Sequence, residues 1–178
     1  AGLSAEIVRL ALRFRGLVQM SQQKDSSDIA VKREAIKLKQ SLDEFYKDYS
    51  VVVDKDIFIS MLDSYYAAGN SIRIPAYLVT LMDKEKGASA KLVADMFASS
   101  ILPYKDKTYA FLDNYKRKRA KQIEKDPFYR FAKAMVEFSI SELQPITGKF
   151  NRVNDSLMRI YMAGQMEMQK DRDFYPDA

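Results

Sequence analysis

The apolar residues of this chain recur in alternating steps of four and three, and this spacing constrains the fold more than any other feature. The pattern appears twice, from Val31 to Tyr49 and again from Ile146 to Gly164. Such steps place side chains on one face of an α-helix, and their repetition is typical of a coiled-coil seam. Two matching seams predict long helices packed side by side, with central seam residues such as Leu157 buried.

The rest of the sequence also favours helices. Only six Gly and five Pro occur among 178 residues, so few positions interrupt a helical pattern. Short amphipathic stretches occupy the middle, one from Pro75 to Met82 and one that ends before Pro103. We therefore predict an all-α fold, a bundle of long antiparallel helices with shorter helices in the middle.

Polar residues mark the expected starts of the first three helices. Ser4, Asp28 and Asp54 each precede an apolar-periodic stretch and are residue types that cap helices. The polar residues 22–27 are expected to form a loop. Val51–Val53 has strand propensity, but the run is short and isolated, so a turn between two helices is the better interpretation.

Other boundaries are predicted by Gly and Pro. Gly69 is expected to end the third helix in a left-handed cap, and Gly87 is expected to close the Pro75 helix. A helical pattern then covers Tyr104–Lys125. Asp126-Pro127 has the form of a cap followed by the first residue of a helix that extends as far as Met168, kinked or broken at Pro145.

The composition excludes several kinds of active site. The chain has no His and no Cys, which rules out a Ser-His-Asp triad, a Cys-His pair and a His-based zinc site within it. No apolar run approaches the roughly 20 residues that span a bilayer. The net charge of +5 is spread along the chain, so no nucleic-acid partner is predicted.

Two motifs resemble functional sequences without completing them. Gly87-Ala88-Ser89-Ala90-Lys91 lacks the second Gly of a nucleophile elbow and is interpreted as a helix cap. Asp54-Lys55-Asp56 lacks the later ligands of a calcium loop and is interpreted as a helix start. We predict no catalytic, cofactor-binding or metal-ligating residue and no cofactor.

Charged and aromatic pairs also have ordinary explanations. The carboxylate pairs Asp43/Glu44 and Asp171/Asp173 are expected to be solvated. Tyr65 and Tyr66 are adjacent, so both cannot face the core and one is available to a groove or interface.

The basic run Lys116–Lys121 is the one concentrated group of cations. On a helix its charges would point in several directions, with Asp113 and Glu124 pairing with them at helical spacing. A solvated helix is favoured over a polyanion-binding surface.

Four segments of the C-terminal part carry a family resemblance. They are Asp126-Pro127-Phe128-Tyr129, Arg159-x-Tyr161-Met162, Met166-Glu167-Met168 and Phe174-Tyr175-Pro176-Asp177-Ala178. Together they resemble the bacterial dipeptidyl-peptidase 7/11 family. The resemblance implies an exported serine exopeptidase in which a helical domain is inserted in a chymotrypsin-like double barrel.

The resemblance further implies that residues 1–178 are a single helical domain, a fragment of the larger peptidase cut at its C-terminal junction. The domain would cover the cleft and restrict cleavage to peptide ends, with the catalytic His and Asp upstream and the Ser downstream. Its partners would be its own catalytic domain and peptide substrates, a homodimer being left open. The expected location is periplasmic or at the cell surface.

A second hypothesis comes from a different class of protein. The chain would then be a non-catalytic helical interaction or scaffold module without an enzymatic parent, using its basic run to bind polyanions. The sequence does not identify which dipeptides a peptidase parent would release.

Overall fold

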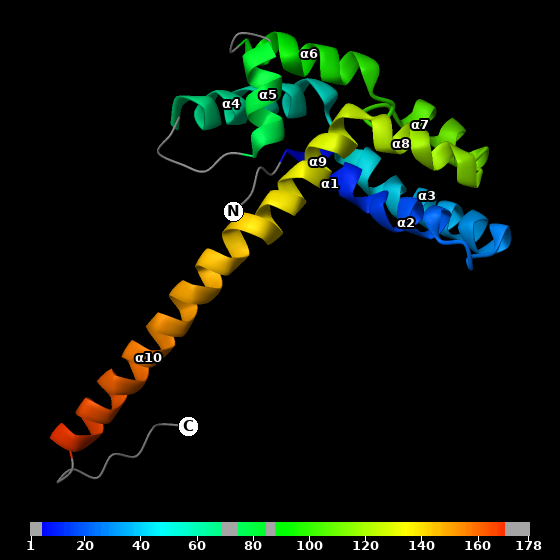
Figure 1. Cartoon of the computed structure of the whole chain (residues 1–178). Coiled ribbons are helices and arrows are strands. Elements are labelled where there is room, and N and C mark those ends of the chain that lie inside the picture. The colour runs from blue at the N-terminus through cyan, green and yellow to red at the C-terminus, as the bar shows by residue number, and fades with distance from the viewer. Residues whose placement is uncertain (1–4, 69–74, 85–87, 170–178) are drawn as a thin grey trace. The chain divides into compact units, whose positions relative to one another are not determined.

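The structure is a computed structural model that describes residues 5–68, 75–84 and 88–169. Every regular element in these ranges is helical and none is a strand, so the predicted all-α fold is confirmed (Figure 1). The chain divides into two compact units, residues 1–136 and residues 137–178.

The first unit begins with two short helices, which are followed by two long ones. Its elements are α1 (Glu6–Arg13), α2 (Arg15–Gln22), α3 (Asp28–Asp48), α4 (Val51–Ala68), α5 (Ala76–Lys84), α6 (Ser89–Ser99), α7 (Lys105–Asp113), the 3₁₀ helix η2 (Arg117–Arg119), α8 (Ala120–Lys125) and most of α9 (Pro127–Phe138). Helix α3 packs against α2 and α7, α4 packs against α6, and α2 packs against α8 (Figure 1).

The core of this unit joins aromatic side chains from helices that are distant in the sequence. Phe58 of α4 is fully buried, and its ring lies 5.7 Å from Phe128 and 5.2 Å from Phe131, both on α9. Phe97 of α6 approaches Phe128 edge-on at 4.8 Å. Edge-to-face packing of this kind is favourable beyond the area buried, so α4, α6 and α9 form one hydrophobic centre.

The seam that was predicted between Val31 and Tyr49 is confirmed. Val31, Ala35, Leu38 and Leu42 are buried. Phe45 and Tyr49 are partly buried, pack against the core and stack on each other with ring centroids 4.7 Å apart. The apolar face of α3 is therefore used within the first unit.

The predicted start of the third helix is wrong by one turn. Val51–Val53 form the first turn of α4, and the predicted linking turn shortens to Tyr49 and Ser50. Asp54 lies inside α4 and is buried, so it does not cap this helix. The Ser50 hydroxyl instead accepts a hydrogen bond from the Val53 amide at 3.5 Å.

The second helix also begins one residue earlier than predicted. Ser27 is the cap of α3, and its hydroxyl accepts a hydrogen bond from the Ala30 amide at 3.1 Å. Asp28 is the first helical residue, which leaves its carboxylate free for another contact. The predicted cap Ser4 and the predicted helix ends Gly69 and Gly87 lie outside the described residues.

The helical pattern between Tyr104 and Lys125 is interrupted in the structure. Helix α7 ends at Asp113, and the chain resumes as η2 and α8. Arg119 stabilises this break, because its guanidinium donates to the carbonyl oxygens of Phe111 and Asn114 at 3.3 and 3.2 Å. These acceptors belong to the last turn of α7, whose carbonyls have no partners inside the helix.

The predicted start of α9 at Pro127 is confirmed. One carboxylate oxygen of Asp126 accepts the amides of Phe128 and Tyr129 at 3.0 and 3.4 Å. The other oxygen accepts the Ser100 hydroxyl at 2.7 Å, which ties this cap to the end of α6. Burial raises the pKa of Asp126 above its ordinary value, although these hydrogen bonds lower it in part.

The α-helical hydrogen-bond pattern changes near the start of the second unit. Residues Ser139–Leu143 form the π-helical segment η3, and α10 (Gln144–Met168) follows without a break. Pro145 lies at the start of α10, where its missing amide proton costs little. Instead of the kink or break that was predicted at Pro145, the structure has a π-helical segment just before this residue.

No residue of α10 is buried by the parts of the chain that the structure describes. Its predicted seam residues are exposed to the following extents: Ile146 50%, Phe150 68%, Val153 52%, Leu157 60% and Ile160 70%. The prediction that Leu157 is buried is wrong for this chain, because the spacing of a seam identifies the face that a partner would cover and not the partner. Within the described ranges, no helix has the length and hydropathy needed to cross a bilayer.

Candidate functional site

The serine of the elbow-like motif has no catalytic surroundings. Ser89 is the first residue of α6 and is 3% exposed. The N-cap of this helix is Ala88, so the interpretation of the motif as a helix cap agrees with its described residues. Among the described residues, the Ser89 hydroxyl oxygen has no hydrogen-bond partner and no base to activate it. Gly87 lies outside the described residues.

The calcium-like motif contains a structural carboxylate. Asp54 accepts the Glu6 and Ile7 amides at 2.7 and 3.0 Å, and the Tyr49 hydroxyl donates to it at 3.1 Å. Asp54 therefore caps α1, a helix 48 residues earlier in the sequence, and its negative charge suits the positive end of that helix. Burial, and after it the charge of Asp54, raises the pKa of Tyr49.

The two carboxylate pairs that the sequence singled out lie on the surface or outside the described ranges. Asp43 accepts the Tyr109 hydroxyl at 2.7 Å and pairs with Lys105 at 3.6 Å. Asp171 and Asp173 are outside the described residues. The described residues contain no group of three or more His, Cys, Asp or Glu side chains that could hold a metal.

The two adjacent tyrosines of α4 divide as expected. Tyr65 is partly buried and packs against the core. Tyr66 is 53% exposed. The prediction that they do not both face the core is confirmed.

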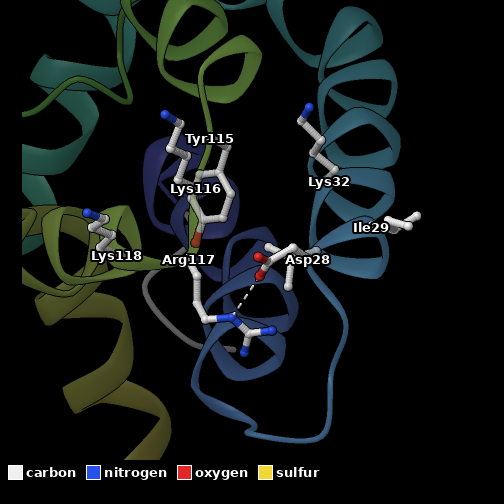
Figure 2. Close-up of a pocket in the computed structure, with 8 residues that line it drawn as sticks. Asp28, Ile29, Lys32, Tyr115, Lys116, Arg117 and Lys118 are labelled. Carbon is white, nitrogen blue, oxygen red and sulfur yellow. Dashed lines mark hydrogen bonds and ion pairs between the residues drawn. The ribbon is translucent and has the colours of Figure 1, made fainter.

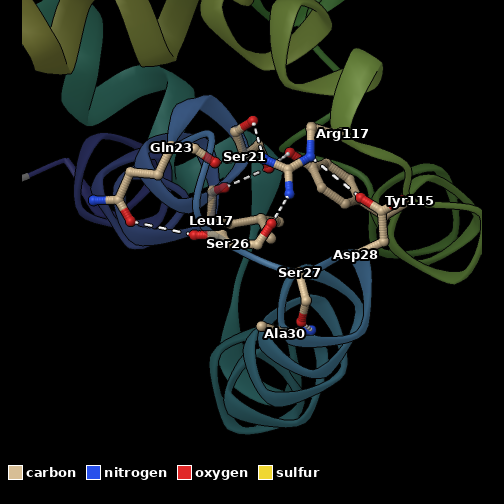
Figure 3. A network of polar contacts seen from close by, with 9 residues as sticks. All are labelled: Leu17, Ser21, Gln23, Ser26, Ser27, Asp28, Ala30, Tyr115 and Arg117. Atoms are coloured by element: carbon tan, nitrogen blue, oxygen red, sulfur yellow. Dashed lines mark hydrogen bonds and ion pairs between the residues drawn. The ribbon is translucent and has the colours of Figure 1, made fainter.

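The basic run is used for structure at two of its positions. Arg117 donates to the carbonyl oxygens of Ser21 and Gln23 at 3.1 and 2.6 Å, and also to that of Ser26. Its Nε donates to the Asp28 carboxylate at 3.2 Å. Figure 3 shows the guanidinium surrounded by these acceptors of the α2–α3 loop. Five donors in a fixed plane suit this arrangement, so Arg117 holds the loop closed.

A buried pair of hydroxyls lies beside this clamp. The Ser21 and Tyr115 hydroxyl oxygens are 2.9 Å apart, and Ser21 also donates to the Leu17 carbonyl at 2.7 Å (Figure 3). Burial raises the pKa of Tyr115, so this hydroxyl stays protonated at neutral pH. The pair fixes Tyr115 against α2 and thereby positions the residues that follow it.

A hollow of about 800 Å³ opens between the first turns of α3 and the α7–η2 connection (Figure 2). Its lining includes four cations and one carboxylate, together with apolar side chains. The lining residues include Asp28, Val31, Lys32, Tyr115, Lys116 and Lys118. Arg117 contributes the fourth cation and is paired with Asp28. We call this feature the basic hollow.

The predicted neutralisation of the basic run within one helix is wrong. Asp113 pairs with Lys39 of α3 at 2.5 Å, and Glu124 accepts from Gln22 of α2 at 2.6 Å. Because the run lies on a connection, a 3₁₀ helix and the start of α8, helical spacing does not apply to it.

The sequence does not connect Lys32 with the basic run, since 84 residues or more separate them. Among the described residues, Lys32, Lys116 and Lys118 have no ion pair. The sequence contained one indication of this site, because Asp28 is an acidic residue just ahead of the basic residues in the first turns of α3. Its partner Arg117 could not be identified without the fold.

Comparison with known proteins places this chain among peptidases. The profile of Peptidase S46 matches residues 2–178, nearly the whole chain. The chain belongs to the Peptidase S46 family. This confirms the resemblance to the dipeptidyl-peptidase 7/11 enzymes.

Several curated relatives of this Peptidase S46 chain carry dipeptidyl-peptidase names. A dipeptidyl-peptidase 7 of Porphyromonas gingivalis is 30% identical over 141 residues, which are 78% of this chain and 20% of that protein. An Asp/Glu-specific dipeptidyl-peptidase of the same organism is 28% identical over 157 residues, 85% of this chain and 21% of that protein. A dipeptidyl-peptidase 7 of Capnocytophaga gingivalis is 23% identical over 154 residues, 86% of this chain and 20% of that protein.

The chain therefore spans about a fifth of the length of these curated relatives. No solved structure matches it. Membership of the family relates the chain to dipeptidyl peptidases, while the part that it plays in such an enzyme has to be argued from its own residues.

Proposed function

We propose that this chain is the helical cap domain of a serine-type dipeptidyl peptidase that releases dipeptides from peptide N-termini. Residues 1–178 would form one inserted domain of that enzyme. The domain would cover the cleft and restrict access to it, without supplying a catalytic residue.

The observation that carries this proposal is the family match over residues 2–178 in a chain without His or Cys. A serine peptidase needs a general base for its nucleophile, and His is the usual one. The chain also spans only about a fifth of its relatives. The catalytic triad is therefore assigned to another part of the full-length protein.

The exposed face of α10 supports a covering role. Its seam residues are half or more exposed in this chain, a large apolar surface for a protein in water. Apolar residues in steps of four and three suit packing against another helix or a flat apolar surface. We assign this face to packing against the remainder of the full-length peptidase.

The proposal includes a location and an assembly. The enzyme would be exported to the periplasm or the cell surface, where peptides from outside the cell are available. Its partners would be the catalytic domain of the same polypeptide and peptide substrates, and a homodimer of the full-length protein is compatible with both.

The test uses the full-length protein with three peptides: one with a free N-terminus, the same peptide acetylated, and a longer peptide with an internal copy of the cleaved bond. The wild-type enzyme should release a dipeptide from the first only. Leu157→Gln should loosen the cap and allow cleavage of the other two. Asp155→Asn is the matched control, since residues two apart lie on nearly opposite sides of a helix.

Two results would overturn the proposal in different ways. If the full-length protein releases no dipeptide, the enzymatic assignment fails. If it does so, but Leu157→Gln keeps strict dependence on the free N-terminus at the wild-type rate, the enzyme stands and the cap role fails.

The alternative remains a helical interaction module without an enzymatic parent. It is favoured by the basic hollow, which needs no catalytic domain to act. The sequence of the parent gene on both sides separates the two hypotheses, because only the cap domain requires a peptidase barrel there.

A further inference from the structure

The basic hollow contains cations that the fold does not use. Arg117 and Arg119 satisfy backbone carbonyls, and Lys39 and Lys105 pair with carboxylates. Lys32, Lys116 and Lys118 have no such partners among the described residues, and all three are exposed around one hollow. Like charges gathered at one place repel each other, so an anion bound between them is stabilised.

The geometry places two of these lysines on opposite sides of the hollow. Figure 2 shows Lys32 and Lys116 extending in the same direction from the two sides of the hollow, with the Tyr115 ring between them. The hollow is about 800 Å³, within the range of about 300–1,000 Å³ that is typical of ligand sites. Arg117 and Asp28 close one part of its lining through their ion pair. The site is therefore a hollow with cations on its rim.

We propose that the basic hollow binds an acidic peptide segment, with carboxylates of its Asp or Glu side chains held by Lys32, Lys116 and Lys118. This inference is independent of the proposed peptidase function, because it requires only the first unit of the chain. The acidic segment would be a partner that the proposed cap function does not require.

The lining favours a peptide over a nucleic acid. Ile29, which is 66% exposed, and the methylene stems of the lysines offer apolar surface that suits the aliphatic part of a Glu side chain. The arginine that could bind a phosphate in bidentate fashion is fully engaged with the α2–α3 loop.

The floor of the hollow is rigid. Tyr115 is 3% exposed and its hydroxyl is bonded to Ser21, while Arg117 holds three carbonyls of the loop. Rigid support lowers the entropy that is lost on binding, since on the protein side only the lysine side chains have to be ordered.

The test measures the fluorescence anisotropy of a labelled hexaglutamate peptide with the full-length protein at low ionic strength. The double variant Lys32→Gln/Lys116→Gln should weaken binding about tenfold, equivalent to roughly 1.4 kcal/mol. The matched control is Lys37→Gln/Lys47→Gln, two exposed lysines of α3 that do not line the hollow. It removes the same charge and should weaken binding less than about twofold, by charge alone.

Each other outcome overturns the proposal. Equal weakening by both double variants would show attraction to net charge and no site, and unchanged binding in Lys32→Gln/Lys116→Gln would exclude the hollow. If tricarballylate competes as well as the peptide at equal carboxylate concentration, the ligand is a small organic acid. If hexathymidylate binds more tightly through the same lysines, the partner is a nucleic acid.

Discussion

The two seams of this chain have the same spacing and opposite environments. From Val31 to Leu42 the seam of α3 is buried against α2 and α7. From Ile146 to Ile160 the seam of α10 is exposed along its whole length. The spacing is set by the geometry of the helix alone, whereas burial needs a second surface. The comparison teaches that periodicity predicts which face of a helix seeks a partner, and leaves open whether the chain contains it.

The largest expected effect tests the buried side of this comparison. Phe58→Ala removes a fully buried ring that contacts Phe128 and Phe131, and should lower the free energy of unfolding by about 3–5 kcal/mol. Urea unfolding of the 178-residue chain, followed by circular dichroism, measures it. Val52→Ala, at a position 71% exposed, is the control. An unchanged midpoint for Phe58→Ala would mean that α4 and α9 do not share a core.

A smaller effect is expected for the polar support of the first unit. Asp54→Asn replaces one acceptor oxygen by an amide donor and leaves a buried backbone amide of α1 without a partner. The expected loss is about 1–3 kcal/mol. The exposed Asp56→Asn, on the same helix, should be nearly neutral. If both variants unfold at the wild-type midpoint, the capping of α1 by Asp54 is wrong.

The buried carboxylate Asp126 predicts a dependence of stability on pH. Because its pKa is raised in the folded state, the folded protein binds more protons than the unfolded protein above the ordinary aspartate value of about 3.9. The contribution of Asp126 to stability is therefore greatest below that value and falls as pH rises through its raised pKa.

The measurement is the difference in free energy of unfolding between wild type and Asp126→Asn across this range. Relative to Asp126→Asn, the wild type should lose stability as pH rises. A difference that grows with pH would show that the hydrogen bonds to Asp126 outweigh its burial.

The smallest effect tests the exposed side of the comparison. Leu157 is 60% exposed, so Leu157→Ala should change the stability of the 178-residue chain by less than about 0.5 kcal/mol. In the full-length protein the same change should cost about 2–5 kcal/mol, if the seam is covered there as proposed. Equal effects in both proteins would contradict a covered seam and remove the distinction between the two regions.

Local signals in the sequence predicted the helices well. The α3 seam and the Asp126-Pro127 start are encoded by neighbouring residues, so spacing and capping preferences identify them. The errors at Asp54 and Asp28 share a cause. Both side chains serve a partner far along the chain, α1 for Asp54 and Arg117 for Asp28, and no local pattern contains that information.

The candidate site was less predictable for the same reason. The basic run was visible, but the sequence could not show that two of its arginines are used for structure. Nor could it show that Lys32 lies across a hollow from Lys116 (Figure 2). Both features depend on tertiary contacts. These contacts bring together, at one site, charges that are dispersed in the sequence.

The distant cap of α1 has a consequence for the order in which the protein folds. Helix α1 has eight residues, too few to be stable alone, and its end is completed by a side chain 47–48 residues later. Closing that loop costs chain entropy before the contact contributes any stabilisation. During synthesis from the N-terminus, α1 would therefore leave the ribosome before α4 and have its N-terminal end completed only after α4 has arrived. The order of α1 and α4 in the sequence is therefore not the order in which their native contacts are completed.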